Sequence, residues 1–505
     1  MADKFIKINT DGLQAPKVGD GLFENRISVV EQLQQTASAE VTIIIQAYGR
    51  LEKTKRCVES VLKYTTGIDY ELILIDNGSI DDTLEYFRSV PWEKKTILHI
   101  TYNIGAGYPS LMLGLGQFGR YVCIVGNDVI VTKDWMKNLL ACIRSDPKIG
   151  MVVPMSSNVS NCQRVELTYQ TGEEMQAEAE RFNRPDPKKW EERLRLITVA
   201  TLYRKEVLLA VGWPLNDLGF FHDFGDDDLS FAIRRAGYRI MVAGDTWVCH
   251  NHDIPHMEGK NSVEFVRSLN IGRDNFREKY YGLDAWDDVN NFYGPYLGCL
   301  PYQEDLDTVR ILGVDVRCGT PILDVKNWLR WRGTNQAELS AFTQDAKYWV
   351  DLKTICQGPV ICDREEFLMD SFPREYFDYV VADRPLNRYH EPQKVMNDLF
   401  ALCKKGGIVL CKVQNAFSFR EYIHLLGQRD VCAEEFSYNI PLEVFQTALN
   451  KVGRVSYMQG IASPAPDGQR ELLESLMPAA CSNEEKQELV DRMCCQEFML
   501  FVEKI

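Results

Sequence analysis

Residues 41–50 read VTIIIQAYGR, and three runs of the same kind follow: ELILIDNGSIDD (71–82), TILHITYNIGAG (96–107) and YVCIVGNDVIV (121–131). Each run begins with a short apolar segment rich in β-branched residues and ends in polar or glycine residues. Helical periodicity fills the intervals, and GMVV (150–153) supplies a fifth strand. Strands that alternate with helices imply right-handed crossovers and a mostly parallel sheet. The sequence therefore predicts an α/β, Rossmann-like fold that binds its ligands in the loops after the strands.

Length and composition indicate a globular protein with more than one domain. The chain has 505 residues, of which 45% are hydrophobic and 26% are charged; the composition is ordinary, but the chain is long for a single core. The net charge of −15 argues against a nucleic-acid partner, because phosphate backbones require clustered Lys and Arg. An acidic protein that handles an anionic nucleotide needs local positive charge, and a bound divalent cation supplies it.

The amino terminus has no signal-peptide pattern, and no apolar run approaches the roughly 18 to 20 residues needed to cross a bilayer. We therefore expect a cytoplasmic protein without a transmembrane segment. The 15 cysteines are scattered through apolar segments, so we expect reduced core residues such as Cys123, Cys142 and Cys411. The adjacent Cys494 and Cys495 have no second pair at zinc-ligand spacing, and we expect no metal site there.

Shifts in composition divide the chain into four segments. Residues 1–38 are predicted to be an N-terminal extension with one amphipathic helix around residues 23–33, and residues 39–285 the first α/β domain. A linker rich in tyrosine, asparagine and proline is predicted over 286–308, and a second α/β domain over 309–505. The second domain is indicated by further strand patterns: VRILGVDVRCGTP (309–321), EYFDYVVADRPLNRYHEP (375–392), LCKKGGIVLCKVQN (402–415) and EFMLFVEKI (497–505).

Two acidic loops in the first domain are candidates for chemistry. Asp128 follows an apolar strand and can hold Mg²⁺ or Mn²⁺ with its carboxylate, while diphosphate and water complete the coordination. Asp134 is better placed to cap the helix that follows it. The run FGDDDLSFAIRRAGYRI (224–240) places Asp226, Asp227 and Asp228 at the start of a helix. One aspartate would complement the helix dipole, but three repel one another, so a general base is expected among them.

Two other segments of the first domain carry expectations. The segment WVCHNHD (247–253) supplies His250 and His252 at a strand end, where we expect one of them to be a metal ligand. A charged insert, GEEMQAEAERFNRPDPKKWEERLRL (172–196), has a helical pattern interrupted by Pro185 and Pro187. It is either a lid or acceptor-recognition element, or a solvated helical hairpin.

Taken together and in this order, six motifs between residues 41 and 253 resemble those of glycosyltransferase family 2 and related GT-A enzymes. The motifs are QAYGR (46–50), IDNGSIDDT (75–83), YNIGAGYPSLMLGL (102–115), GNDVIV (126–131), FGDDDLSFAIRRAGYRI (224–240) and WVCHNHD (247–253). The resemblance implies an inverting, metal-dependent transfer of a sugar from a nucleotide-diphosphate sugar, most often a UDP-sugar. The implied acceptor is a surface glycan, a lipid-linked precursor or a protein; the sequence names neither the sugar nor the nucleotide.

The same resemblance assigns roles to individual residues. Asp128 and His250 would hold Mn²⁺ or Mg²⁺, and Asp226 would be the general base. The donor-binding residues would be Ala47, Tyr48, Arg50, Asp76, Asn77, Gly105 and Asn127. Two positions depart from the family pattern. Gly126 stands at the first acidic position of the DXD motif, and Gly225 replaces the expected glutamate, so Asp227 and Asp228 stay alternatives for the base.

The second domain resembles class I methyltransferases that bind S-adenosylmethionine. Where that family has Gly-x-Gly-x-Gly, this chain has Arg317, Gly319 and Pro321. The arginine brings a side chain into the cofactor space and the proline removes a backbone donor. Asp345 is the candidate acid for the ribose. We expect acceptor recognition, homodimer formation or a scaffold role ahead of methyl transfer; a bifunctional glycosyl- and methyltransferase and a non-catalytic nucleotide-sugar-binding module are the alternatives.

Overall fold

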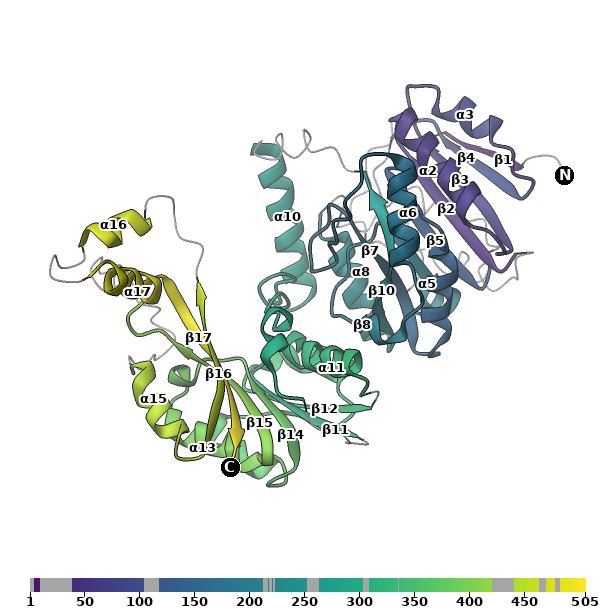
Figure 1. The fold of residues 1–505 in the computed structure, drawn as a ribbon. Helices are drawn as coiled ribbons and strands as arrows, with labels where there is room; N and C mark the ends of the chain where they lie inside the picture. Colours follow the sequence, from purple (N-terminus) through teal and green to yellow (C-terminus); the bar gives the residue numbers. More distant parts are fainter. Residues whose placement is uncertain are drawn as a thin grey trace. The chain divides into compact units, whose positions relative to one another are not determined.

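The protein divides into two compact units, Met1–Asn290 and Asn291–Ile505, each built on its own β-sheet (Figure 1). The computed structural model describes residues 4–9, 39–103, 118–211, 217, 220, 223–251, 263–302, 308–334, 336–419, 440–462, 469–476 and 482–505. The helix expected around residues 23–33 lies outside these ranges, and so do Gly105 and His252.

Unit 1 is a mostly parallel sheet flanked by helices, as the sequence predicts. Over the described residues the sheet has ten strands, in the order β1-β4-β3-β2-β5-β9-β7-β10-β6, with β8 paired to β10. Strand β9 is antiparallel to both of its neighbours. The strands are β1 (Lys4–Ile8), β2 (Val41–Ala47), β3 (Tyr70–Asn77), β4 (Lys95–Ile100), β5 (Tyr121–Gly126), β6 (Val129–Ile130), β7 (Ile149–Ser156), β8 (Trp190–Glu192), β9 (Ala200–Arg204) and β10 (Arg239–His250).

Helices cover both faces of this sheet. The helices are α2 (Leu51–Tyr64), α3 (Thr83–Ser89), α5 (Trp135–Arg144), α6 (Gly172–Phe182), α7 (Lys205–Val211), α8 (Gly225–Arg235) and α10 (Val263–Lys279). Alternate residues of β2 face opposite sides, so Ile43 and Ile45 pack with α2, α3 and α5, whereas Ile44 packs with α7 and α8. Figure 1 shows α2 and α5 on the near face of the sheet. The loops at the carboxyl ends of the strands are thus held on a rigid, three-layered body.

Two local expectations for unit 1 are wrong. Asp134 precedes α5, but its backbone is left-handed (φ 60°) and its side chain makes no capping hydrogen bond; side-chain caps require an extended backbone at that position. The insert 172–196 is not a helical hairpin. Only α6 is an α-helix; Pro187 begins a short 3-10 turn, η1 (Pro187–Lys189), which is followed by β8, and β8 pairs with β10.

Unit 2 is a second α/β body. Its sheet, over the described residues, has seven strands in the order β13-β12-β11-β14-β15-β17-β16, with β17 antiparallel to both neighbours. The strands are β11 (Val309–Val314), β12 (Ala337–Thr343), β13 (Val360–Cys362), β14 (Phe377–Ala382), β15 (Cys403–Gln414), β16 (Gly453–Ala462) and β17 (Cys495–Lys504). The α-helices are α11 (Thr320–Arg332), α12 (Trp349–Ile355), α13 (Pro392–Leu402), α15 (Leu442–Leu449), α16 (Gln469–Leu476) and α17 (Asn483–Cys494). Short 3-10 turns complete it: η3 (Gly294–Cys299), η4 (Ala346–Tyr348), η5 (Glu365–Phe367), η6 (Met369–Ser371) and η7 (Leu386–Arg388).

The predicted α/β class is confirmed for both units. Within the described ranges, no helix is long and apolar enough to cross a membrane. The cysteines in these ranges are free thiols, and Cys123, Cys142 and Cys411 are buried as expected. Cys162, Cys299 and Cys362 are exposed instead, so the expectation of core positions fails for these three.

Candidate active site

The loop after β2 is pinned to the loop after β3, at the carboxyl edge of the sheet. The Gly49 N–H donates to Ser79 Oγ (2.9 Å), and the Leu51 N–H donates to Asp81 Oδ2 (3.1 Å). Arg50 adopts a left-handed backbone (φ 57°) where α2 begins. Ala47 is buried at the end of β2, whereas the Tyr48 side chain is 53% exposed and reaches solvent at this edge. The sequence placed Ala47, Tyr48 and Arg50 in a nucleotide pocket, and the structure positions them on one anchored turn.

Asp76 and Asn77 lie at the end of β3 with their side chains bound to protein. Asp76 is fully buried; its Oδ1 accepts the Ser79 N–H (3.1 Å) and its Oδ2 lies 2.6 Å from His99 Nδ1. Asn77 Nδ2 donates to Asn103 Oδ1 (3.0 Å). These contacts stiffen the loop on which a base or ribose contact is predicted. His99 carried no signal in the sequence, because a histidine within an apolar strand is an ordinary strand residue.

Asp128 and His250 are brought together by a short antiparallel pairing. Strand β6 follows Asp128 directly and pairs with the end of β10, with Val129 opposite His250. As a result His250 Nε2 lies 3.6 Å from Asp128 Oδ1. A Cβ added at Gly126 would lie only 3.2 Å from that same oxygen. The missing first carboxylate of the DXD motif therefore leaves room for the Asp128 carboxylate.

The geometry of His250 suits a metal ligand. Its Nδ1 lies 3.2 Å from the carbonyl oxygen of Asn158, which can only accept a hydrogen bond. In the neutral ring the proton therefore sits on Nδ1, and Nε2 turns a lone pair toward Asp128. Two ligands bound to one Mg²⁺ or Mn²⁺ at about 2.1 Å lie roughly 3 to 4 Å apart, which the 3.6 Å separation satisfies. Nowhere in the described ranges do three His, Cys, Asp or Glu side chains converge on one metal position.

Asn127 joins this loop to α2, since its Nδ2 donates to Thr54 Oγ1 (3.0 Å).

The next element of the site is the run of aspartates in α8, whose members have different environments. Asp227 is buried, forms an ion pair with Arg195 and accepts from Trp286 Nε1 (3.2 Å). Asp228 is buried too; its Oδ1 accepts from Tyr280 Oη (2.6 Å) and lies 2.7 Å from Lys279 Nζ. Both carboxylates are thus engaged with a cation inside the protein.

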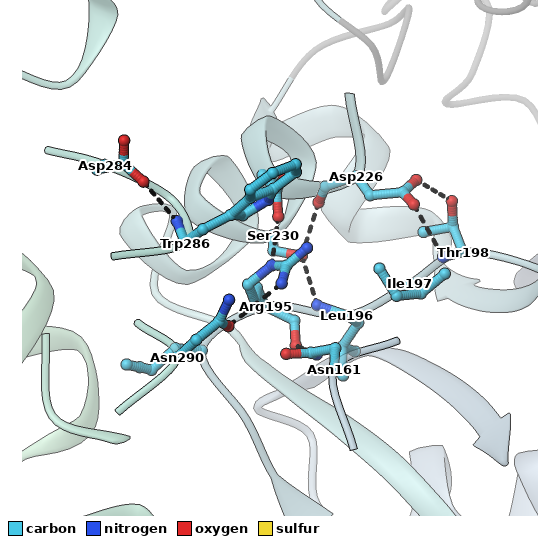
Figure 2. Close-up of polar contacts among 12 residues, drawn as sticks. Asn161, Arg195, Leu196, Ile197, Thr198, Asp226, Ser230, Asp284, Trp286 and Asn290 are labelled. Carbon is cyan, nitrogen blue, oxygen red and sulfur yellow. Dashed lines mark hydrogen bonds and ion pairs between the residues drawn. The ribbon is translucent and has the colours of Figure 1, made fainter. Parts of the chain in front are cut away.

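Asp226 is partly exposed, and its carboxylate accepts from the hydroxyl and the N–H of Thr198 (Figure 2). Among the described residues, no cationic side chain bonds to it. Desolvation raises the pKa of Asp226; hydrogen bonds from Thr198 oppose the rise and the charge of Asp227 adds to it. One residue after Thr198, the Val199 carbonyl accepts the Gly126 N–H (3.0 Å). Asp226 and the loop of Asp128 are therefore bound to adjacent residues of one segment.

One strained loop, 157–163, holds both sides of this site. Asn158 and Ser157 bond to His250, while Asn161 Nδ2 donates to the Arg195 carbonyl (2.6 Å) and Gln163 Oε1 accepts the Ile197 N–H (2.8 Å). Left-handed backbone occurs at three non-glycine residues of the loop: Asn158 (φ 51°), Asn161 (φ 61°) and Cys162 (φ 54°). Such strain gathers at functional sites. No expectation from the sequence fell on this loop, although it contains two asparagines, the residues that tolerate left-handed backbone best after glycine.

In unit 2 the predicted cofactor loop connects β11 to α11. Arg317 has a left-handed backbone (φ 53°), and its Nε lies 3.7 Å from Oδ2 of Asp383, which is also paired with Lys412. Asp345 caps η4 by accepting the Lys347 N–H (3.0 Å). The cofactor loop thus carries an arginine side chain directed at the end of β14, and the expected ribose acid serves as a cap. These residues do not fit the glycine-lined loop that S-adenosylmethionine requires.

Comparison with known proteins supports the family resemblance of unit 1. Residues 42–211 match the family described as Glycosyl transferase family 2, so this part of the chain is a domain of that family. The uncharacterized protein y4gI of Sinorhizobium fredii is 27% identical over 223 residues, which are 39% of this chain and 23% of that protein. The match thus spans less than a quarter of that relative.

Solved structures with remote likeness fall into two groups. GalNAc-T7 with UDP, GalNAc and Mn²⁺ has a TM-score of 0.36 and 16% identity, covering 53% of this chain and 52% of that one. A mannosyltransferase from Pyrobaculum calidifontis, in complex with GDP-Man and Mn²⁺, has a TM-score of 0.33 and 15% identity, covering 46% and 65%. An S-adenosylmethionine-dependent methyltransferase from Archaeoglobus fulgidus has a TM-score of 0.30 and 13% identity, covering 46% and 99%. Likeness this remote says nothing about substrates.

Proposed function

We propose that unit 1 is an inverting, cation-dependent glycosyltransferase that uses a nucleotide-diphosphate sugar. One observation carries the proposal: the Asp128–His250 pair and the half-buried Asp226 are both bound to the same edge of a family 2 domain, through the 195–199 segment and the 157–163 loop. In this proposal the Asp128–His250 pair supplies the cation site and Asp226 supplies the base, and cation-dependent inverting transfer needs both.

The roles follow from the contacts. Asp226 accepts the proton of the acceptor hydroxyl as that oxygen attacks the anomeric carbon, and its raised pKa suits a general base. Asp128 and His250 hold the cation, which when bound stabilises the negative charge that develops on the leaving diphosphate. The turns at Tyr48–Arg50 and Asp76–Asn77 bind the nucleotide. A single displacement, with the base on the acceptor side, inverts the anomeric configuration.

Unit 2 is proposed to recognise the acceptor, or to form a homodimer, and not to transfer methyl groups. The acceptor is a glycan, lipid-linked or protein hydroxyl, and cytoplasmic location stays a prediction. UDP-sugars are the donors to test first, followed by dTDP- and GDP-sugars.

The test is nucleotide release with Mn²⁺ and a panel of these donors. We expect one donor to be turned over by the wild type, with the loss of that activity in Asp128→Ala and in samples treated with a chelator. A control variant, Glu85→Ala, removes an exposed carboxylate that pairs with Arg88 on α3, and should leave release unchanged. If no donor binds or turns over, or if Asp128→Ala releases nucleotide as fast as the wild type, the proposal fails.

A further inference from the structure

The residue after the proposed base is unusual. Position 227 is an aspartate whose carboxylate faces Arg195, and both residues are buried, with Asp227 3% exposed and Arg195 5% exposed. The pair has further partners. Trp286 Nε1 donates to Asp227 Oδ2 (3.2 Å). Arg195 donates to Asn290 Oδ1 (3.2 Å; Figure 2). When a buried ion pair is replaced by apolar residues of similar volume, the folded protein is often as stable as before or more stable. Stability alone therefore does not explain it.

The pair lies at one end of a ladder of contacts that ends at Asp226. Arg195 binds Asp227, the Leu196 N–H donates to Ser230 Oγ (3.1 Å), and Ser230 Oγ donates to the Asp226 carbonyl (2.8 Å). Thr198 then binds the Asp226 carboxylate. Figure 2 shows this ladder between the 195–198 segment and the first turns of α8. The register of the segment against the helix thus sets where the Asp226 carboxylate points.

We propose that Arg195 and Asp227 are a positioning pair for Asp226, holding its carboxylate toward Thr198 and balancing each other's charge beside it. The inference rests on the proposed role of Asp226 as base. Neither residue touches substrate in this scheme; both act through Asp226.

The charges around Asp226 give the pair a distinctive signature. Among the described residues, the titratable groups that interact with Asp226 are Asp227, Arg195 and the buried phenol of Tyr203. Loss of the Asp227 charge leaves Arg195 to favour the ionised form of Asp226, and loss of the Arg195 charge leaves Asp227 to disfavour it. Removing one member or the other should therefore move the titration of Asp226 in opposite directions. Simple loss of packing would not.

The experiment is the pH profile of kcat at saturating donor and Mn²⁺, for Asp227→Asn, Arg195→Gln and the double variant Arg195→Met with Asp227→Leu. We expect the acid limb to move down by roughly 0.5–1 pH unit in Asp227→Asn and up by a similar amount in Arg195→Gln. The double variant should lie between them, with reduced kcat and a donor KM within about twofold of the wild type. It also provides a folded variant if a single substitution unfolds the protein, because apolar replacement of a buried pair is tolerated.

Arg193→Gln is the matched control. It breaks a neighbouring ion pair, with Glu191, in the same stretch of chain, and should leave the acid limb in place. The inference is overturned if folded variants shift the limb in the same direction, or not at all. Failure of the proposed function is a separate result: Asp226→Asn would then keep its turnover.

Discussion

Three consecutive aspartates show how neighbours in sequence come to differ in chemistry. Successive residues of a helix point about 100° apart, so Asp226, Asp227 and Asp228 face different surroundings. Asp227 pairs with Arg195, and Asp228 contacts Lys279 and Tyr280, whereas the side-chain hydrogen bond of Asp226, over the described residues, comes from the neutral Thr198. Among the described residues, the proposed base is thus the one carboxylate of the three without an ion pair.

Asp226→Asn should abolish transfer without loss of fold. We expect kcat to fall by about 10²–10⁴-fold, because the amide cannot accept the proton, while the donor still binds. In the wild type, the raised pKa of Asp226 places the acid limb above the range of an ordinary aspartate, since the base must be ionised. Stopped-time nucleotide release between pH 4 and pH 8 measures kcat and its acid limb. Titration calorimetry measures donor binding. Loss of donor binding along with turnover would argue against a role as base.

Asp228→Asn should behave differently. The substitution removes one of the two carboxylates that pair with Lys279, while Asp217 (2.6 Å) remains, so we expect a loss of about 1–3 kcal/mol in the free energy of unfolding of unit 1. Urea unfolding followed by tryptophan fluorescence measures the change. A stable Asp228→Asn protein without activity would instead make Asp228 the better base.

At the scale of elements, the 157–163 loop determines how His250 faces Asp128. The imidazole Nδ1 of His250 contacts the backbone carbonyl oxygen of Asn158. The left-handed backbone of Asn158 sets the position of that carbonyl. Substitution at this position therefore acts through the backbone more than through the lost side chain.

Two variants separate these effects. Asn158→Val forces a β-branched residue into a left-handed conformation, and we expect about a tenfold or greater rise in the Mn²⁺ concentration needed for half-maximal release. Asn158→Gly removes the side chain but tolerates the backbone, and should stay within about threefold of the wild type. Mn²⁺ titrations of nucleotide release compare them. Equal effects in both variants would mean that the Asn158 side chain, not the carbonyl, matters.

At the scale of the whole molecule, the chain carries two α/β units, and our proposal assigns the chemistry to the first. We expect no saturable binding of S-adenosylmethionine or S-adenosylhomocysteine to the full chain. The Arg317 side chain points toward Asp383 at the loop where the cofactor would approach the backbone, and Pro321 donates no N–H. Isothermal titration calorimetry tests this expectation, with Arg317→Gly and Pro321→Gly together as the variant that restores glycines. Micromolar binding by the wild type would favour the bifunctional alternative.

Much of the fold was predictable because its signals are local. The apolar runs became β2 to β5 and β7, and the polar residues after them became loops at one edge of the sheet, since period and turn chemistry depend on a few adjacent residues. The predicted cap at Asp134 and the helical-hairpin alternative for the 172–196 insert were wrong because they depend on features that a local pattern does not record. A cap depends on one backbone angle, and the second arm of the insert took its structure from pairing with β10.

The sequence by itself determined two α/β units, the family 2 character of residues 42–211 and the residue types at the strand ends. Only the tertiary structure decided which of those residues meet. The pairing of β6 with β10 put His250 beside Asp128, and Arg195 and Lys279 took up Asp227 and Asp228 while leaving Asp226 to Thr198. Such contacts join residues far apart in the chain, and they depend on sheet register and helix orientation, which no local pattern records.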